Sequence, residues 1–320
     1  MTTPTSRRRP RTVTLRAAAL LAAVALPLTA CGAGGPAAGA QDQDPAAAKI
    51  PTTDVVSGIP KDPSAAKLLP AAVRSRGTLA LASSVGAPPG ATYLPDGRTV
   101  AGQDIDFADA VAKVLGVRLT REVAGFEAIL PALDSGKYDL GTGNFGVTDE
   151  RRKAIDFVTY INDGQGFAVR DDSPLKKVTS LRQLCGLTVA TGAGTTFEAT
   201  LEDHRKDCTA AGKKPYDVKT YAEQGALWIS LQQGRSDVVM STINGLRYAV
   251  RQQPGLRFLN EFQRLDVGFA FKKGSPLTAA VQAAVNRLKK DGRYDRILKK
   301  WGTSPSAIKT SQISPPELGR

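Results

Sequence analysis

The stretch GNFGVTDERRKAIDF at residues 143–157 predicts the start of a short helix. One cation lies at an unfavourable position in that helix. Thr148 is a favoured N-cap, and the two acids that follow it complement the positive end of a helix. Arg151 takes the third helical position, where a cation opposes the helix dipole at a cost of about 0.3–1 kcal/mol. The sequence therefore raises the question of what offsets this cost at Arg151. One answer is a surface Arg paired with a nearby acid, as we expect for Arg152.

A second stretch, GAGTTFEA at residues 192–199, has the composition of an anion-binding turn. It follows a predicted strand and opens a predicted helix, with Thr195 or Thr196 at the N-cap. Free amides at such a helix start bind carboxylate or phosphate groups. Phe197 replaces the third glycine of a dinucleotide-binding fingerprint, and no Lys precedes the Thr as in a phosphate-binding loop. An ordinary capped helix explains the pattern equally well.

Strands and helices alternate between residues 71 and 303. The pattern predicts strands at 78–84, 118–123, 138–143, 187–191, 218–222 and 236–242, and helices at 107–116, 126–137, 196–206 and 223–235. Asp106 is the expected N-cap of the first of these helices. Alternation with short connections indicates α/β lobes with parallel sheets flanked by helices, and the length suffices for two lobes.

A weak internal repeat relates the two expected lobes. ALDSGKYDLGTGN at 132–144 aligns without gaps to SLQQGRSDVVMST at 230–242, and each copy is a helix end, a capping Gly and a buried strand. Asn144 and Thr242 therefore fall at the carboxyl ends of equivalent strands, where ligands bind in open α/β sheets. Reuse of a stable αβ turn is the simpler explanation of the repeat, but both explanations give these two positions.

The first 30 residues have the order of a bacterial export signal. Residues 1–16 hold five arginines and no acid, and the apolar run at 17–30 is too short to span a bilayer but suits a signal core. The run leads into LTAC, which resembles the lipobox of bacterial lipoproteins and implies lipidation of Cys31. An ordinary signal with a buried Cys is the alternative. Sec and twin-arginine export both stay open.

Charge and cysteine content fit an exported protein. The net charge is +13, but the first 30 residues hold five of the 43 Lys and Arg and none of the 30 Asp and Glu, which leaves +8 for the mature chain. No dense basic block with interleaved aromatics occurs, so we expect no nucleic acid partner. Cys185 and Cys208 form an even pair that favours a disulfide. His204 is the only His and no CxxC motif occurs, so we expect neither a metal site nor His-assisted nucleophilic catalysis.

The two ends of the mature chain have linker-like composition. Residues 31–70 are rich in Ala, Gly and Pro, which predicts a flexible tether between lipid and folded region. Residues 304–320, which carry several Ser and Pro, are expected to form a flexible tail.

Residues 71–303 resemble the substrate-binding proteins of bacterial polar amino acid ABC importers, the extracellular solute-binding protein family 3. The similar blocks are GTLALASSVGAPPG, GQDIDFADAVAKVLGV, FEAILPALDSGKYDLGTGNFGVTDERRKAIDFVTY, GAGTT, GRSDVV and LKKDGRYDRILKKWG, and they follow in the family's order. The resemblance implies a type II periplasmic-binding-protein fold, with two α/β lobes joined by hinge strands near 164–170 and 266–272. Lobe 1 would comprise 71–167 plus 266–303, and lobe 2 residues 168–265.

The resemblance also implies a ligand-binding set. Arg151 matches the family's Arg that clamps the ligand's α-carboxylate. Thr196, with Thr195 beside it, and the Gly146 amide would share that carboxylate from opposite lobes. Phe126 matches an aromatic that packs on the ligand, although it would serve equally well as the first core residue of its helix.

Several positions depart from the family pattern. Thr242 stands where the family has an Asp that binds the ligand's ammonium group. Gly90 replaces a turn aromatic, and Tyr93 is the candidate substitute wall. Asn144 and Gly146 replace hydroxyl residues beside the ligand, and Gln103 replaces the aromatic before Asp104. Ser84, at the end of the first strand, completes the predicted set.

These features predict a lipid-anchored receptor on the extracytoplasmic face of a bacterial membrane. It would close around a small carboxylate, most simply an amino acid or derivative, and deliver it to an ABC permease. We expect a monomer, no cofactor and no catalysis. Two alternatives stay open: a prephenate dehydratase-like enzyme with Glu127 or Asp104 as acid or base, and a sensing module without transport.

Overall fold

The computed structural model describes residues 50–319. The predicted signal, Cys31 and the first part of the predicted tether lie outside these residues. Within residues 50–319, no helix has the length and apolar character needed to cross a membrane.

The central feature of the fold is an eight-stranded sheet shared by two lobes. Its strands are β1 (Thr78–Ser83), β4 (Arg118–Val123), β5 (Leu140–Gly146), β6 (Ile155–Arg170), β7 (Thr188–Gly192), β8 (Asp217–Tyr221), β9 (Val238–Thr242) and β10 (Leu256–Lys272). They lie in the order β4-β1-β5-β10-β6-β9-β7-β8. Strands β1, β4 and β5 are parallel in lobe 1, and β7, β8 and β9 are parallel in lobe 2, as the alternating pattern predicts. A separate pair, β2 (Thr92–Tyr93) and β3 (Val100–Ala101), lies beside lobe 1.

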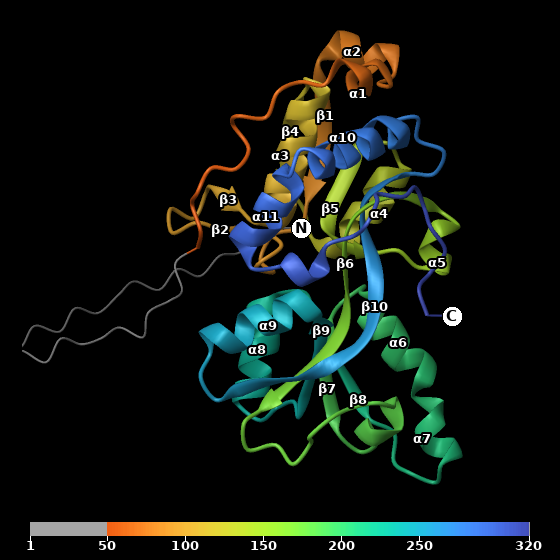
Figure 1. The fold of residues 1–320 in the computed structure, drawn as a ribbon. Coiled ribbons are helices and arrows are strands. Elements are labelled where there is room, and N and C mark those ends of the chain that lie inside the picture. Colours follow the sequence, from red (N-terminus) through yellow and green to blue (C-terminus); the bar gives the residue numbers. More distant parts are fainter. Residues whose placement is uncertain (1–49, 320) are drawn as a thin grey trace, which may run out of the picture. The chain divides into compact units, whose positions relative to one another are not determined.

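Two long antiparallel strands, β6 and β10, connect the lobes (Figure 1). β10 pairs with β5 of lobe 1 from Val267 to Ala270, and β6 pairs with β9 of lobe 2 from Gln165 to Val169. The stretch 162–164 of β6 pairs only with β10, so the crossing lies there. Of the hinge positions expected near 164–170 and 266–272, Gly164 and Asp266 lie in this crossing stretch. Residues 165–169 pair with β9 of lobe 2, and β10 pairs with β5 of lobe 1 from Val267 to Ala270.

The crossing strands approach each other closely. Gly164 has a φ of +143°, and a Cβ at this position would lie 2.2 Å from the Gln263 carbonyl oxygen. A side chain at residue 164 would therefore push the two strands apart, and glycine permits both the backbone conformation and the approach.

Helices cover the sheet of lobe 1. They are α1 (Pro63–Lys67), α2 (Ala71–Arg76), α3 (Gln103–Leu115), α4 (Phe126–Asp134), α5 (Asp149–Arg152), α10 (Thr278–Lys290) and α11 (Arg293–Trp301). Thr148 caps α5 by accepting from the Arg151 amide, as the sequence predicts. The expected cap of α3 at Asp106 is wrong, because the helix begins one turn earlier after Gly102. Asp106 instead lies inside the helix and pairs with Lys300 Nζ at 2.8 Å.

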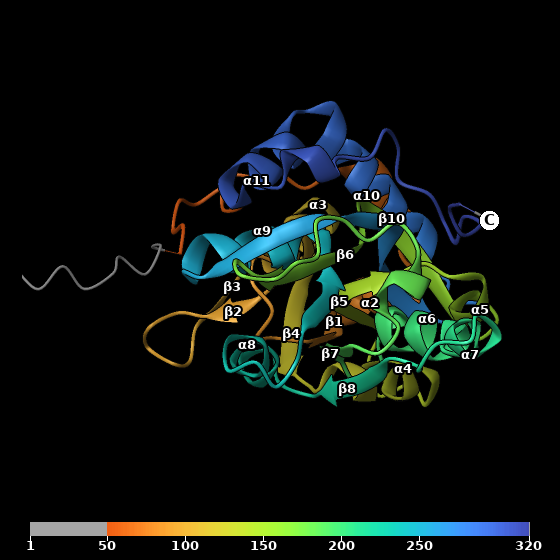
Figure 2. The same ribbon diagram turned by 90° about the horizontal axis from the view of Figure 1, so that it is seen from below.

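Lobe 2 has helices on both sides of its strands. They are η1 (Leu181–Leu184), α6 (Thr196–His204), α7 (Lys206–Ala210), α8 (Gln224–Gln232) and α9 (Ile243–Gln252). Figures 1 and 2 show α6 and α7 on one side of β7 and β8 and α8 on the other. Separate apolar clusters fill the two sides, one around Phe167, Leu201 and Tyr216 and one around Leu227 and Leu246.

The segments expected to be loose at both ends are in part packed on lobe 1. Ile59, Ala65 and Leu69 join its apolar core, so residues 50–70 are not a tether. After η2 (Ser304–Ser306), the C-terminal segment runs beside β6, where the Thr159 amide donates to the Gln312 carbonyl. The tail prediction is therefore wrong for residues 304–319, because backbone pairing that joins residues far apart in the chain has no local signal.

The predicted disulfide joins Cys185 to Cys208 across 23 residues. Replacing both with Ser should lower the free energy of unfolding by about 3 kcal/mol, because the unfolded chain regains the freedom of a closed loop of this length. Urea unfolding with and without a reducing agent measures the loss. The reduced native protein should match the double Ser variant, and equal stability of oxidised protein and variant would contradict the prediction.

Candidate ligand-binding site

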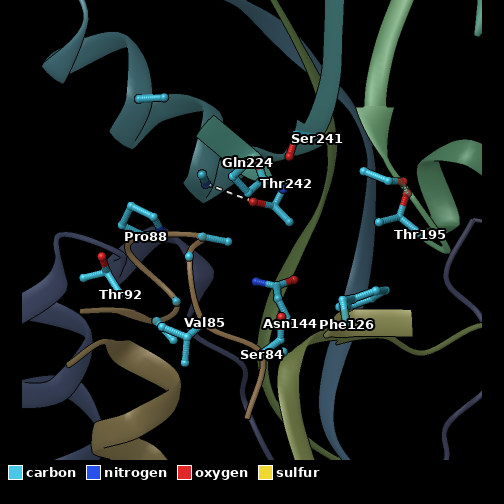
Figure 3. A pocket seen from close by; sticks show the side chains of 18 of the residues that line it. Ser84, Val85, Pro88, Thr92, Phe126, Asn144, Thr195, Gln224, Ser241 and Thr242 are labelled. Carbon is cyan, nitrogen blue, oxygen red and sulfur yellow. Dashed lines mark hydrogen bonds between the residues drawn. The ribbon is translucent and has the colours of Figure 1, made fainter. Parts of the chain in front are cut away.

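A cavity of about 350 Å³ lies between the lobes. Its walls come from the carboxyl ends of strands in both lobes and from the loops and helices that follow them, as Figure 3 shows. Ser84 follows β1, Asn144 lies near the end of β5, and Thr242 ends β9. The prediction that Asn144 and Thr242 occupy matching strand ends is confirmed as geometry, and both face this cavity.

Most of the predicted site residues line the cavity, and two do not. Those that line it are Ser84, Phe126, Asn144, Arg151, Thr195, Thr196 and Thr242. Tyr93 is 42% exposed on β2 and forms no part of the wall. Gly146 is buried behind the wall, yet a Cβ on it would lie 3.8 Å from Thr196 Cγ2, so these two residues approach each other from opposite lobes.

Arg151 lies in the cavity wall without a carboxylate partner among the described residues. Its Nη1 donates to the Gly146 carbonyl at 3.2 Å, and its Nη2 donates to the Gly194 carbonyl in lobe 2 at 3.3 Å. Desolvation lowers the pKa of the guanidinium to about 10, still well above neutral pH. Arg151 is thus a charged group in the cavity whose protein partners are neutral. Arg152 differs, because it pairs with Asp149 at 2.7 Å as expected.

Phe126 serves the core and the cavity together. Its ring stacks on Phe145 with centroids 4.8 Å apart and packs against the apolar cluster under α4. The Arg151 guanidinium lies 5.7 Å from the Phe126 ring centroid, within range of a cation–π contact. Phe126 therefore fixes one side of Arg151, and the two interpretations of this residue are compatible.

The two threonines at the start of α6 have different surroundings. Thr195 is the N-cap: its Oγ1 accepts from the Glu198 amide at 3.3 Å and donates to the Gly192 carbonyl at 2.6 Å. The Thr196 hydroxyl has no hydrogen-bond partner in the described part of the chain, and Thr196 lines the cavity. Of the two hydroxyls, only that of Thr196 is thus free to bind a ligand.

Asn144 is held between two buried carboxylates. Its backbone amide donates to Asp104 Oδ2 at 3.1 Å, and its side-chain Nδ2 donates to Asp163 Oδ2 at 3.0 Å. Burial raises the pKa of Asp163 to about 6 and also raises that of Asp104. The residue has a left-handed φ of +55°, which Asn tolerates better than most residues. The rigid backbone position presents the Asn144 side chain at the centre of the cavity, between Ser84 and Thr242 (Figure 3).

Thr242 is the N-cap of α9 as well as a wall residue. Its Oγ1 accepts from the Gly245 amide at 3.0 Å, the dashed contact in Figure 3. The backbone amide of Asn244, one residue before Gly245, donates to Asp163 Oδ1 at 3.1 Å. The start of α9 is therefore already satisfied by protein groups and offers no free amide at these two positions.

The sequence reasoning missed a large part of the lobe 2 wall. The additional residues include Tyr221, Glu223, Gln224, Trp228, Ser241, Asn244, Tyr248, Gln252 and Gln253. The rule that ligands bind at strand ends would have found Tyr221 to Gln224, because Tyr221 is the last residue of β8 and the others follow it. The side chains on the later turns of α9 have no such signal. Glu127, considered as a catalytic group, does not line the cavity, whereas Asp104 does.

Two lobes on a shared sheet, with a cavity between their strand ends, define a hinged solute-binding fold of the type II periplasmic class. The model of the bacterial extracellular solute-binding proteins, family 3, matches residues 79–304. The chain belongs to this family of solute-binding proteins.

Curated and solved relatives agree with this assignment. The arginine-binding protein of Corynebacterium glutamicum is 28% identical over 252 residues, which cover 77% of this chain and 81% of that protein. An ancestral arginine-binding protein solved with arginine is 34% identical, with a TM-score of 0.64 over 71% of this chain and 98% of the other. An ancestral amino acid-binding protein described as a precursor of cyclohexadienyl dehydratase is 28% identical, with a TM-score of 0.64 over 72% and 97%.

The different surroundings of Thr195 and Thr196 predict different effects of removing each hydroxyl. Thr195→Ala should lower the free energy of unfolding by about 1 kcal/mol, because α6 loses its cap. Thr196→Ala is the matched control and should leave stability within about 0.5 kcal/mol. Urea unfolding of the ligand-free proteins measures both, and a larger loss for Thr196→Ala would contradict the assignment of the cap.

Proposed function

We propose that this protein binds a small solute with a free carboxylate group, an amino acid or a close derivative, in the cavity between its lobes. The observation that carries the proposal is Arg151, a charged guanidinium that lines the cavity and has no acid partner in the described residues. Guanidinium and carboxylate form paired, charge-assisted hydrogen bonds that neutral carbonyls do not match. Relatives named for arginine binding support this class of ligand.

Groups from both lobes surround the proposed carboxylate position. Arg151 belongs to lobe 1 and reaches the Gly194 carbonyl of lobe 2, beside the free hydroxyl of Thr196. A carboxylate held by Arg151 and Thr196 together would link the two lobes. Ligand binding would then favour the closed arrangement, because only there can both groups contact one carboxylate.

Arg151→Met tests the carboxylate clamp. We expect loss of ligand-induced thermal stabilisation by a panel of L-amino acids and small carboxylic acids, measured by differential scanning fluorimetry. A carboxylate at one hundred times its dissociation constant should stabilise the native-sequence protein by about 2.7 kcal/mol. Arg152→Met is the control, since Arg152 pairs with Asp149 and does not line the cavity. Unchanged stabilisation in Arg151→Met, or stabilisation by amines alone, would contradict the proposal.

We also propose that the mature protein begins at a lipidated Cys31, resides on the extracytoplasmic face of the membrane as a monomer and delivers its ligand to an ABC permease. The LTAC lipobox, the short apolar signal core and the family membership support this placement.

Cys31→Ser tests the anchor. Without the thiol no lipid can be attached, so the variant should move from the membrane fraction to the soluble or secreted fraction. Immunoblotting of fractionated cells expressing each form measures the distribution. Membrane retention of the Ser variant would contradict lipid anchoring and would leave the carboxylate proposal untouched.

A further inference from the structure

An amino acid is a zwitterion, so a cavity that binds one needs a group of negative charge or potential for the ammonium end. Among residues 50–319, three charged side chains line the cavity: Arg151, Asp104 and Glu223. Thr242 is uncharged and its oxygen already accepts from the Gly245 amide. The negative charge or potential can therefore come from an acid in the wall, from an uncharged acceptor there, or from a carboxylate behind the wall.

Glu223 does not suit this task. It is exposed at the start of α8, where water and salt screen its charge. Asp104 is only 2% exposed, and its two oxygens already accept from the Asn144 amide and from the Tyr160 hydroxyl at 2.8 Å. Asp104 thus contributes negative potential to the cavity but presents little surface to a ligand.

Asn144 presents an acceptor in the right place. Its Nδ2 is committed to Asp163, whereas its side-chain carbonyl has no partner among residues 50–319. With Nδ2 fixed by a carboxylate, the amide carbonyl is polarised toward greater negative charge. The side chain lines the cavity, and Figure 3 draws it between Ser84 and Thr242.

The carboxylate behind Asn144 is fully buried and has no ion pair within the described part of the chain. Asp163 is 0% exposed, and the donors to its oxygens in this part of the chain are Asn144 Nδ2 and the Asn244 amide. The charged or titratable groups around it are Arg264, which pairs with Glu261 instead, together with Asp104 and Tyr160. A buried carboxylate without a cation is costly, and an ammonium group nearby would relieve that cost.

The position of Asp163 in the sheet places its charge beside Thr242. Gln165 of β6 pairs directly with Thr242 of β9, and Asp163 lies two residues along β6, past the end of β9. Its carboxylate accepts a hydrogen bond from the backbone amide of Asn244, the second residue of α9. Helix α9 itself begins directly after Thr242. A neighbouring strand thus supplies the negative charge that the end of β9 lacks.

We propose that the side-chain carbonyl of Asn144 and the buried carboxylate of Asp163 behind it form the receptor for the α-ammonium group of an amino acid whose carboxylate is bound by Arg151. This proposal rests on the carboxylate-binding function proposed above. It makes Asn144 a ligand contact and Asp163 a positioning and charge-supplying residue that acts through it.

The test compares each L-amino acid that stabilises the purified protein with its 2-hydroxy acid analogue, which keeps the carboxylate and side chain but lacks the ammonium. Isothermal titration calorimetry gives both dissociation constants. We expect the native-sequence protein to bind the amino acid about tenfold or more tightly, the typical worth of a hydrogen bond to a charged group.

Two variants remove the receptor in different ways. Asp163→Asn removes the charge, and Asn144→Gly removes the carbonyl while tolerating the left-handed backbone. In both, the preference for the amino acid over the hydroxy acid should fall toward one. Asp106→Asn is the control, because Asp106 is paired with Lys300 and does not line the cavity, so the preference should persist. The preference is the ratio of the two dissociation constants measured on the same variant. A loss of stability in that variant affects both constants equally and cancels in the ratio.

The outcomes separate the two proposals. A hydroxy acid that binds as tightly as the amino acid, with binding still lost in Arg151→Met, would overturn the ammonium receptor and leave the carboxylate function standing. A preference that survives in both Asp163→Asn and Asn144→Gly would place the ammonium elsewhere and also overturn it. If no carboxylic acid binds, both proposals fail.

Discussion

The partly buried guanidinium of Arg151 is the constraint on which the site depends. It occupies the third position of α5, where the helix dipole opposes a cation, and no carboxylate among the described residues neutralises it. Two backbone carbonyls and the face of Phe126 contact it instead. Neutral acceptors compensate a desolvated charge only in part, so the protein alone leaves this position electrostatically incomplete. A negative ligand would complete it, and the proposal of carboxylate binding rests on this charge and on the free hydroxyl of Thr196 in the cavity wall.

The shared sheet explains how distant residues come to surround that charge. Each lobe has its own apolar cores on the two faces of its strands, so each resists deformation. Only β6 and β10 cross between the lobes in the sheet, and the passage is confined to a few residues beside Gly164. Strand ends from both lobes therefore face one cavity, and any hinge motion of the lobes would be concentrated at one short stretch.

Features that rest on local rules were predictable from the sequence. The Thr148 cap, the parallel strands on either side of short helices and the Cys185–Cys208 disulfide all follow from residue type and spacing. The strand-end rule likewise found Asn144 and Thr242. The start of α3 was misplaced because Asp106 has the composition of a cap, whereas its partner Lys300 lies far along the chain.

Features that depend on long-range contacts were not predictable. The C-terminal segment has the composition of a loose tail, yet it pairs with β6 at Thr159, more than 150 residues away in sequence. Asp163 gave no signal at all, because its surroundings come from Asn144 and Asn244, 19 and 81 residues distant. A buried acid becomes interpretable only when the fold shows which donors surround it and which cations do not.

The location of Asp163 connects ligand charge to lobe position. It lies in the crossing stretch of β6 and accepts hydrogen bonds from Asn144 of lobe 1 and Asn244 of lobe 2. Its carboxylate thus contacts both lobes. The lobes also meet where Arg151 donates to the Gly194 carbonyl and where Asn244 is hydrogen-bonded to Ser306 of the C-terminal segment. A ligand shifts a conformational equilibrium only by its difference in affinity for the two states. Under the two proposals above, a zwitterion whose charges engage Arg151 at one end and the Asn144–Asp163 unit at the other would bind best when the lobes make both the Arg151–Gly194 contact and the contacts of Asp163. A solute carrying only one of the charges would gain from one contact alone, so the arrangement proposed to select the ligand would also select the closed state.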